Sequence, residues 1–220
     1  MANNYYDATG VLVLDQVTPV ITTLFGTMNL NPSYPGNGEA YFAMIAGQTG
    51  AHWDNIRDDL IAFAQSLGLS VPSKDAPAMD DVLDILAVHF GTDQDEEPQH
   101  LIEHHPFEDD VGLAALFLIA TRLDDGHGLK EIRMEGCWYC DKARLFNFGG
   151  EGSFISREYS VYGATGHVLF VGNRIRQALL VNDLETATNE LVIETRRLLG
   201  GIGDETQRQQ LQERLATLLH

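Results

Sequence analysis

Apolar residues recur at helical spacing along much of the chain. Between residues 53 and 67 they lie three or four positions apart, which predicts an amphipathic helix that Gly68 ends. Within residues 15–25, Pro19 suits the first turn of a shorter helix. The same spacing predicts further helices over residues 82–90, 110–123, 167–180, 184–199 and 204–219.

Strand patterns occupy other parts of the chain. Apolar runs at 11–14 and 40–46 predict two short strands, and the Asn, Pro and Gly residues at 29–38 predict a loop between them. Alternating apolar and polar residues predict an antiparallel meander formed by segments 129–139, 144–148 and 153–162.

This order of elements favours the α+β class, because strands and helices do not alternate as in a doubly wound sheet. With 220 residues the chain can bury a full core. We expect a single compact, helix-rich domain over residues 1–220, in which a small antiparallel sheet, with strands near 40–46 and 129–162, packs against helices. A finer division separates a mostly helical acidic part, 1–125, from the strands and C-terminal helices of 126–220.

The helices predicted at 167–180 and 184–199 are joined by a tight turn in which Asp183 can act as the N-cap of the second helix. Their apolar residues predict a shared core between the two helices. On the first helix these are Leu169, Val171, Ile175, Leu179 and Leu180, and on the second Leu184, Leu191, Ile193 and Leu198. The alternative is that part of this apolar surface pairs with a second copy of the chain.

The charge is strongly acidic and unevenly distributed. The chain has 32 Asp and Glu against 14 Lys and Arg, a formal net charge of -18. Residues 75–121 contain no Lys or Arg, whereas residues 136–220 hold ten acids and nine bases. The twelve acids of the base-free segment are Asp75, Asp80, Asp81, Asp84, Asp93, Asp95, Glu96, Glu97, Glu103, Glu108, Asp109 and Asp110. They form either a solvated face or an anionic binding surface, and their excess argues against direct nucleic-acid binding.

The chain shows no signal-peptide pattern at its start, and its longest strongly apolar run, residues 113–120, is too short to cross a bilayer. We therefore expect no membrane association. Two cysteines, Cys137 and Cys140, offer no disulfide framework. These features together favour a cytoplasmic location.

Residues 100–104 match H-x-x-E-H, the zinc-binding order of the inverzincins. Segments 100–107 and 149–162 also resemble the pitrilysin-like metallopeptidases. That resemblance implies a zinc-dependent hydrolase in which His100 and His104 hold the metal and Glu103 activates its water. It also implies a third ligand from a distant helix, for which the candidates are Glu185, Glu190 and Glu194. The alternative is that the histidines are polar surface residues without a metal.

Cys137 and Cys140 form a C-x-x-C pair, but the residues that follow have a strand pattern rather than the helix of thioredoxin-like sites. A structural zinc site would need two further ligands. The candidates for these ligands are His100, His104, His105 and His127. Otherwise the cysteines are small apolar residues beside Trp138. The sequence contains no EF-hand loop, P-loop or G-x-S-x-G elbow.

These observations favour a non-enzymatic interaction or regulatory protein of the bacterial cytoplasm, without a cofactor. Its partner would be a basic protein or a nucleic-acid-binding protein, as for DNA-mimic inhibitors and for immunity proteins, and a homodimer is a further expectation. The expected interaction surface comprises Asp80, Asp81, Asp84, Asp93, Asp95, Glu96, Glu97, Glu108, Asp109 and Asp110. The alternatives are the zinc-dependent hydrolase, with Glu103 catalytic and His100, His104 and Glu190 as ligands, and a structural zinc protein.

Overall fold

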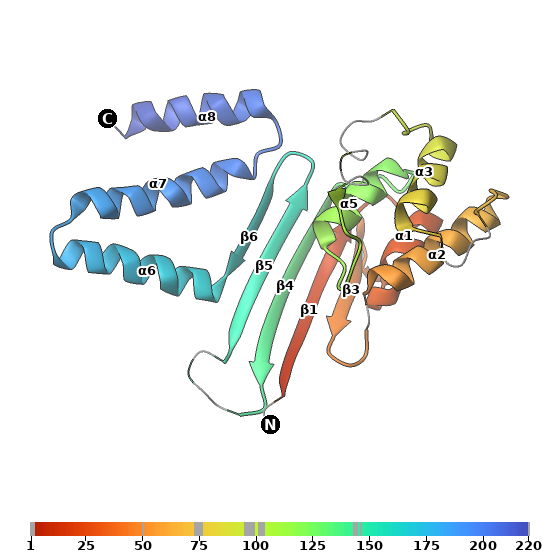
Figure 1. Ribbon diagram of the computed structural model, residues 1–220, viewed down its shortest axis with the longest axis horizontal. Helices are drawn as coiled ribbons and strands as arrows, with labels where there is room; N and C mark the ends of the chain where they lie inside the picture. Colours follow the sequence, from red (N-terminus) through yellow and green to blue (C-terminus); the bar gives the residue numbers. More distant parts are fainter. Residues whose placement is uncertain are drawn as a thin grey trace. The chain divides into compact units, whose positions relative to one another are not determined.

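The computed structural model describes residues 3–49, 51–72, 77–94, 100, 104–142, 145 and 147–219. Seven α-helices and one six-stranded antiparallel sheet are present among these residues, which confirms the α+β class (Figure 1). The strands lie in the order β2-β3-β1-β4-β5-β6. None of the described helices is both long and apolar enough to span a membrane.

Contacts divide the chain into two compact units, which we call the N-terminal unit, residues 6–132, and the C-terminal unit, residues 1–5 with 133–220. The elements of the first half are β1 (Asn4–Val13), α1 (Pro19–Phe25), the 3-10 helix η1 (Gly26–Met28), β2 (Asn31–Pro35), β3 (Glu39–Ile45), α2 (Trp53–Ser66), α3 (Met79–Phe90) and α5 (Leu113–Arg122). The second half contains β4 (Glu131–Cys140), β5 (Gly149–Ser156), β6 (Ser160–Ala164), α6 (Thr165–Leu180), α7 (Leu184–Gly200) and α8 (Glu205–Leu218).

The N-terminal unit holds the larger core. Strand β1 pairs antiparallel with β3, so that Leu12 lies opposite Ala40, and α1 packs against both α2 and α5. The largest side chains that are fully buried in this unit are Leu12, Ile21, Leu24, Phe25, Met28, Phe42, Trp53, Ile56, Leu60, Leu86, Leu116 and Ile132. The predicted helical spacing of α2 and α3 matches this core, because their apolar faces supply its side chains.

The loop prediction for residues 29–38 is wrong in part, because residues 31–35 form the edge strand β2. It pairs antiparallel with β3, with Asn31 opposite Tyr41 and Pro35 opposite Ala40, and its register is irregular. An edge strand needs hydrogen bonds on one side only, so it tolerates the prolines that otherwise indicate a loop.

In the C-terminal unit, the single strand predicted at 153–162 is the hairpin β5–β6, with Phe154 opposite Val161. The N–H of Ser156 donates to the carbonyl of Tyr159 at 2.9 Å and closes the turn. Of the strand predicted at 144–148, the described residues Leu145, Asn147 and Phe148 are not in a strand, and the others lie outside the described residues.

The predicted helix pair exists, but its predicted core is wrong. Asp183 caps α7 by accepting a hydrogen bond from the Thr186 N–H at 3.0 Å, as expected. The buried residues of the two helices are Ala178, Ala187, Glu190 and Leu199. The seven exposed residues of the predicted core are Leu169, Leu179, Leu180, Leu184, Leu191, Ile193 and Leu198, which are 44–63% exposed. The two helices therefore bury two alanines, Glu190 and Leu199, and leave these seven apolar side chains exposed to solvent.

Candidate functional site

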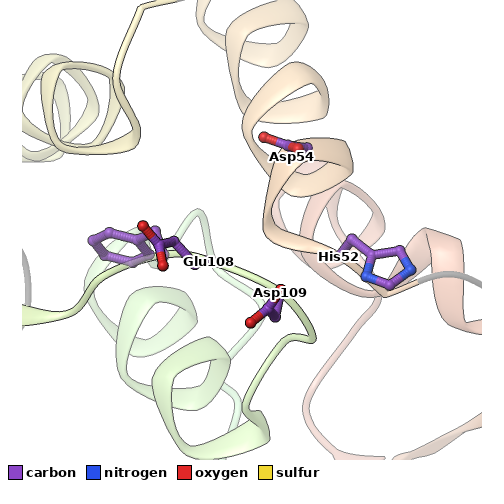
Figure 2. A pocket seen from close by; sticks show the side chains of 5 residues that line it. His52, Asp54, Glu108 and Asp109 are labelled. Atoms are coloured by element: carbon purple, nitrogen blue, oxygen red, sulfur yellow. The ribbon is translucent and has the colours of Figure 1, made fainter.

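A pocket of about 390 Å³ opens beside the start of α2. Its lining residues are His52, Asp54, Phe107, Glu108 and Asp109. Figure 2 shows Asp54 on the first turn of α2, across from Glu108 and Asp109 on the segment that precedes α5. A second pocket of about 270 Å³ shares Asp54 and Phe107 with the first and is also lined by Asp80. We call the two together the acidic pocket.

Backbone hydrogen bonds bring the two walls of the acidic pocket together. The Trp53 N–H donates to the Asp109 carbonyl at 3.2 Å, and the Val111 N–H donates to the Ala51 carbonyl at 2.9 Å. His52 and Asp110 are bridge partners in the same antiparallel arrangement. Segment 109–111 therefore runs beside 51–53, so Asp109 and Asp110 do not cap α5, whose N-cap is Gly112.

An aromatic cluster supports the base of the pocket. The buried Trp53 ring lies 5.1 Å from the His105 ring and 5.0 Å from the Phe107 ring, both edge-on. The Phe107 N–H donates to Nδ1 of His105 at 2.9 Å, and burial lowers the pKa of His105. A neutral imidazole is consistent with its role as an acceptor and with the aromatic packing.

The pocket carries an excess of negative charge. Asp54, Glu108 and Asp109 are exposed, and Nδ1 of His52 lies 3.1 Å from Oδ1 of Asp110. Among the lining residues that the structure describes, Arg57 is the one Lys or Arg, and its guanidinium contacts Asp54 at 2.9 Å. Carboxylates beside an aromatic ring are suited to binding a guanidinium or ammonium group.

The structure brings some of the predicted interaction residues together. Asp80, Glu108 and Asp109 line the acidic pocket, and Asp110 lies beside it through His52. Asp81 and Asp84 are exposed on α3, and Asp93 is exposed after it. Three other predicted residues, Asp95, Glu96 and Glu97, lie outside the described residues.

Sequence reasoning missed several members of the pocket, among them His52, Trp53, Asp54, Arg57 and Phe107. The segment of the first three had no unusual spacing or charge run, and its role depends on pairing with residues 109–111, more than 50 positions away. The Trp-Asp pair at the start of a predicted helix was the only local signal available.

Of the predicted zinc ligands, His100 and His104 lie close together. Their ring centroids are 4.2 Å apart, both residues are exposed, and Nδ1 of His104 lies 3.0 Å from the His100 carbonyl oxygen. That contact leaves Nε2 of His104 for another partner. Glu103 lies outside the described residues, and Glu190 belongs to α7 of the C-terminal unit, where it contacts Arg174. The zinc site therefore stays a prediction.

The two cysteines are free and lie on β4. Cys137 is exposed and Cys140 is buried. Residues three apart on a strand point to opposite faces, so the two thiols do not form the side-by-side pair of a thioredoxin-like site. The Cys140 thiol lies 3.7 Å from Oδ1 of Asp141.

One compact group of potential metal ligands is found among the described residues, namely Asp124, Asp125 and His127, whose ligand atoms lie within 4.8 Å of one another. Hydrogen bonds within the fold already use these atoms. Nδ1 of His127 accepts from the Leu129 N–H at 2.8 Å, and Nε2 lies 2.9 Å from the Ala120 carbonyl oxygen, to which it must donate. The buried imidazole therefore has no free lone pair for a metal.

The two aspartates of this group are also engaged. Asp125 accepts from the Thr18 hydroxyl at 2.5 Å and from the Val20 N–H at 3.1 Å. Asp124 accepts from the Gly126 N–H at 2.9 Å. Burial raises the pKa of Asp124, but backbone N–H donors outweigh this effect and lower the pKa below its ordinary value of 3.8. The group is best explained as a structural turn after α5.

Comparisons with protein-family models, with curated proteins and with solved structures found no match for this chain.

Proposed function

We propose that this chain is a non-enzymatic interaction protein that binds a basic surface on a protein partner through the acidic pocket. The observation that carries the proposal is the convergence of acids from three separate segments. Asp54 begins α2, Asp80 begins α3, and Glu108 and Asp109 precede α5, yet all line the two adjoining pockets.

Arginine or lysine side chains of the partner are the groups that this site would recognise. Exposed carboxylates attract cations over a Debye length and accelerate association. Within the pocket, Asp54 and Glu108 can accept charge-assisted hydrogen bonds, and the half-buried Phe107 ring offers a face to a cation. Surface charge would thus guide the approach, while the concave shape would select a projecting basic side chain.

Arginines of the C-terminal unit have acidic partners of their own. Their guanidinium groups form ion pairs with neighbouring glutamates in the pairs Arg174–Glu190, Arg197–Glu194 and Arg208–Glu205. These three guanidinium groups are therefore used within their own unit. Of the pocket acids, Asp54 pairs with Arg57. The carboxylates offered to an external partner are therefore mainly those of Asp80, Glu108 and Asp109.

Binding to an arginine-rich peptide tests the proposal. We expect the wild-type chain to bind a short tetra-arginine peptide at about 50 mM salt and to lose affinity as salt rises, measured by titration calorimetry. The combined substitutions Asp80→Lys, Asp81→Lys and Glu108→Lys should weaken binding by at least about tenfold.

A matched control changes the net charge by the same amount, but on the C-terminal unit. Glu158→Lys, Glu185→Lys and Glu213→Lys alter three exposed glutamates, and Glu185 lies in the first turn of α7 as Asp81 does in α3. The control should retain most of the affinity. Equal losses in both triple variants would show that net charge alone attracts the peptide, and the proposed site would then be rejected.

A further inference from the structure

The helical hairpin formed by α6 and α7 exposes a stripe of large apolar residues on each helix. On α7, Leu184, Leu191 and Leu198 recur at intervals of seven and are 60%, 57% and 44% exposed. On α6, Val168 and Leu179 are 70% and 54% exposed, with the partly exposed Ile175 between them. An apolar stripe of this length normally packs against another element.

The two stripes lie on the same side of the hairpin. At 3.6 residues per turn, the α6 stripe lies roughly a quarter turn from the buried Ala178, and the α7 stripe lies a similar angle from Ala187 and Glu190. In both helices the stripe is displaced from the buried residues in the same rotational sense along the chain. Because the helices run antiparallel (Figure 1), these two displacements bring both stripes to one face of the hairpin. We call Val168, Gly172, Ile175, Leu179, Leu184, Leu191 and Leu198 the hairpin face.

Polar contacts occupy the line between the helices, which explains why the leucines face outward. The Arg174 guanidinium lies 2.5 Å from Glu190, and Nε2 of His167 lies 2.9 Å from Glu194. These pairs join α6 to α7 and fix the rotation of each helix about its axis. The stripes therefore cannot turn toward each other without breaking the pairs.

Gly172 leaves room for a close approach on this face. It lies in the interior of α6, where glycine is a poor helix former. A Cβ atom at this position would meet nothing within 4 Å in the described part of the chain, so no contact there requires glycine. A close approach by a helix from outside would require it, as at helix crossings that depend on small residues.

We propose that the hairpin face pairs with the same face of a second copy of the chain to form a two-fold symmetric dimer. A leucine repeat of seven residues is self-complementary in such pairing. The apolar surface of two hairpin faces together is on the order of 1,000 Å², which reaches the size of a specific interface.

Charge also favours a second copy as the occupant. Residues 136–220 are nearly neutral, with ten acids and nine bases, whereas residues 1–135 hold 22 acids and five bases. A contact made by the C-terminal helices therefore joins nearly neutral parts of the two chains, with little repulsion between like charges. The proposed contact uses residues of the C-terminal unit only, and it does not depend on the proposed function of the acidic pocket.

Measurement of molar mass tests the dimer. We expect sedimentation equilibrium of the full chain at about 1–100 µM to give twice the chain mass, and Leu191→Lys to give a monomer with unchanged helical circular dichroism. The matched control, Ile193→Lys, alters a 52% exposed residue two positions along α7, on the opposite side of that helix. It should remain a dimer. A monomeric wild type at about 100 µM, or equal dissociation of both variants, would overturn the proposal.

Gly172→Ala provides a second and more specific measurement. Alanine favours the helix, so a monomer with Leu191→Lys should become more stable to heat when Gly172→Ala is added. In the otherwise wild-type chain the same substitution should raise the dissociation constant of the dimer by about tenfold, because a methyl group then separates the two faces. An unchanged or lower dissociation constant would contradict the close approach at Gly172.

Discussion

The guanidinium of Arg174 lies 2.5 Å from the carboxylate of Glu190, whose side chain is only 6% exposed. The same guanidinium lies 5.5 Å from the centre of the Phe170 ring, one turn earlier on α6. Arg174 therefore compensates a buried charge and covers an aromatic ring of its own helix. Glu190, which sequence reasoning offered as a zinc ligand, has a cationic partner within the hairpin.

Replacing Arg174 by alanine should destabilise the C-terminal unit. The substitution leaves the buried Glu190 carboxylate without its partner, and we expect the free energy of unfolding to fall by about 1–3 kcal/mol. This is less than the full cost of breaking a buried pair, because Arg174 is half exposed. Urea unfolding measures the change. The double variant Arg174→Met, Glu190→Leu should recover most of the loss, and a double variant as unstable as Arg174→Ala would contradict this explanation.

Adjacent glycines at the end of α7 should respond in opposite ways to alanine. A Cβ at Gly201 would overlap the carbonyl oxygen of Ser160, whose N–H donates to the Gly201 carbonyl at 2.8 Å. Gly201→Ala should therefore cost about 2 kcal/mol or more, since backbone must move. Gly200 is helical and its Cβ would meet nothing within 4 Å, so Gly200→Ala should raise stability by up to about 1 kcal/mol. Thermal unfolding of both variants checks the contrast, and similar effects would refute it.

Asp183 should make the stability of the C-terminal unit depend on pH. The Thr186 N–H and then the Thr186 hydroxyl donate to its carboxylate, and they lower the pKa of Asp183 below its ordinary value of 3.8. A lowered folded-state pKa stabilises the fold above pH 3.8, and this contribution disappears as pH falls through the folded-state pKa. Asp183→Asn keeps a capping acceptor that does not titrate. Urea unfolding should show wild type more stable than Asp183→Asn at about pH 7, with the difference shrinking as pH falls below about 3.8. A constant difference would exclude the linkage.

His127 should act as a structural residue and not as a metal ligand. His127→Ala leaves the Ala120 carbonyl and the Leu129 N–H without their partner in the core. We therefore expect the free energy of unfolding, measured in urea, to fall by about 2–4 kcal/mol. His52→Ala removes an exposed contact with Asp110 and should cost less than about 1 kcal/mol.

Metal addition provides the complementary measurement for the Asp124, Asp125 and His127 group. The test uses the variant His100→Ala, His104→Ala, which removes the other histidine pair. Because both His127 nitrogens are engaged in hydrogen bonds, excess zinc should leave the melting temperature of this variant unchanged. A rise that disappears with Asp125→Asn would show that the group binds metal.

Much of the secondary structure was predictable from local pattern. Helices α2, α3, α6, α7 and α8 and strand β3 follow the expected spacing, since each needs only a periodic apolar face and suitable ends. Strand β2 was not predicted because its prolines and asparagine indicate a loop. It becomes a strand through pairing with β3, which is a long-range contact that no local pattern contains.

The sequence by itself determined where the helices run, that Asp183 caps α7, and that the middle of the chain has acids and no bases. Only the tertiary structure decided that Asp54 faces Glu108 across a pocket, and that Leu184, Leu191 and Leu198 are exposed to solvent. The physical reason is that spacing establishes which residues share a helix face. Which face becomes buried depends on competing contacts with distant segments, here the pairing of 51–53 with 109–111 and the ion pair between Arg174 and Glu190.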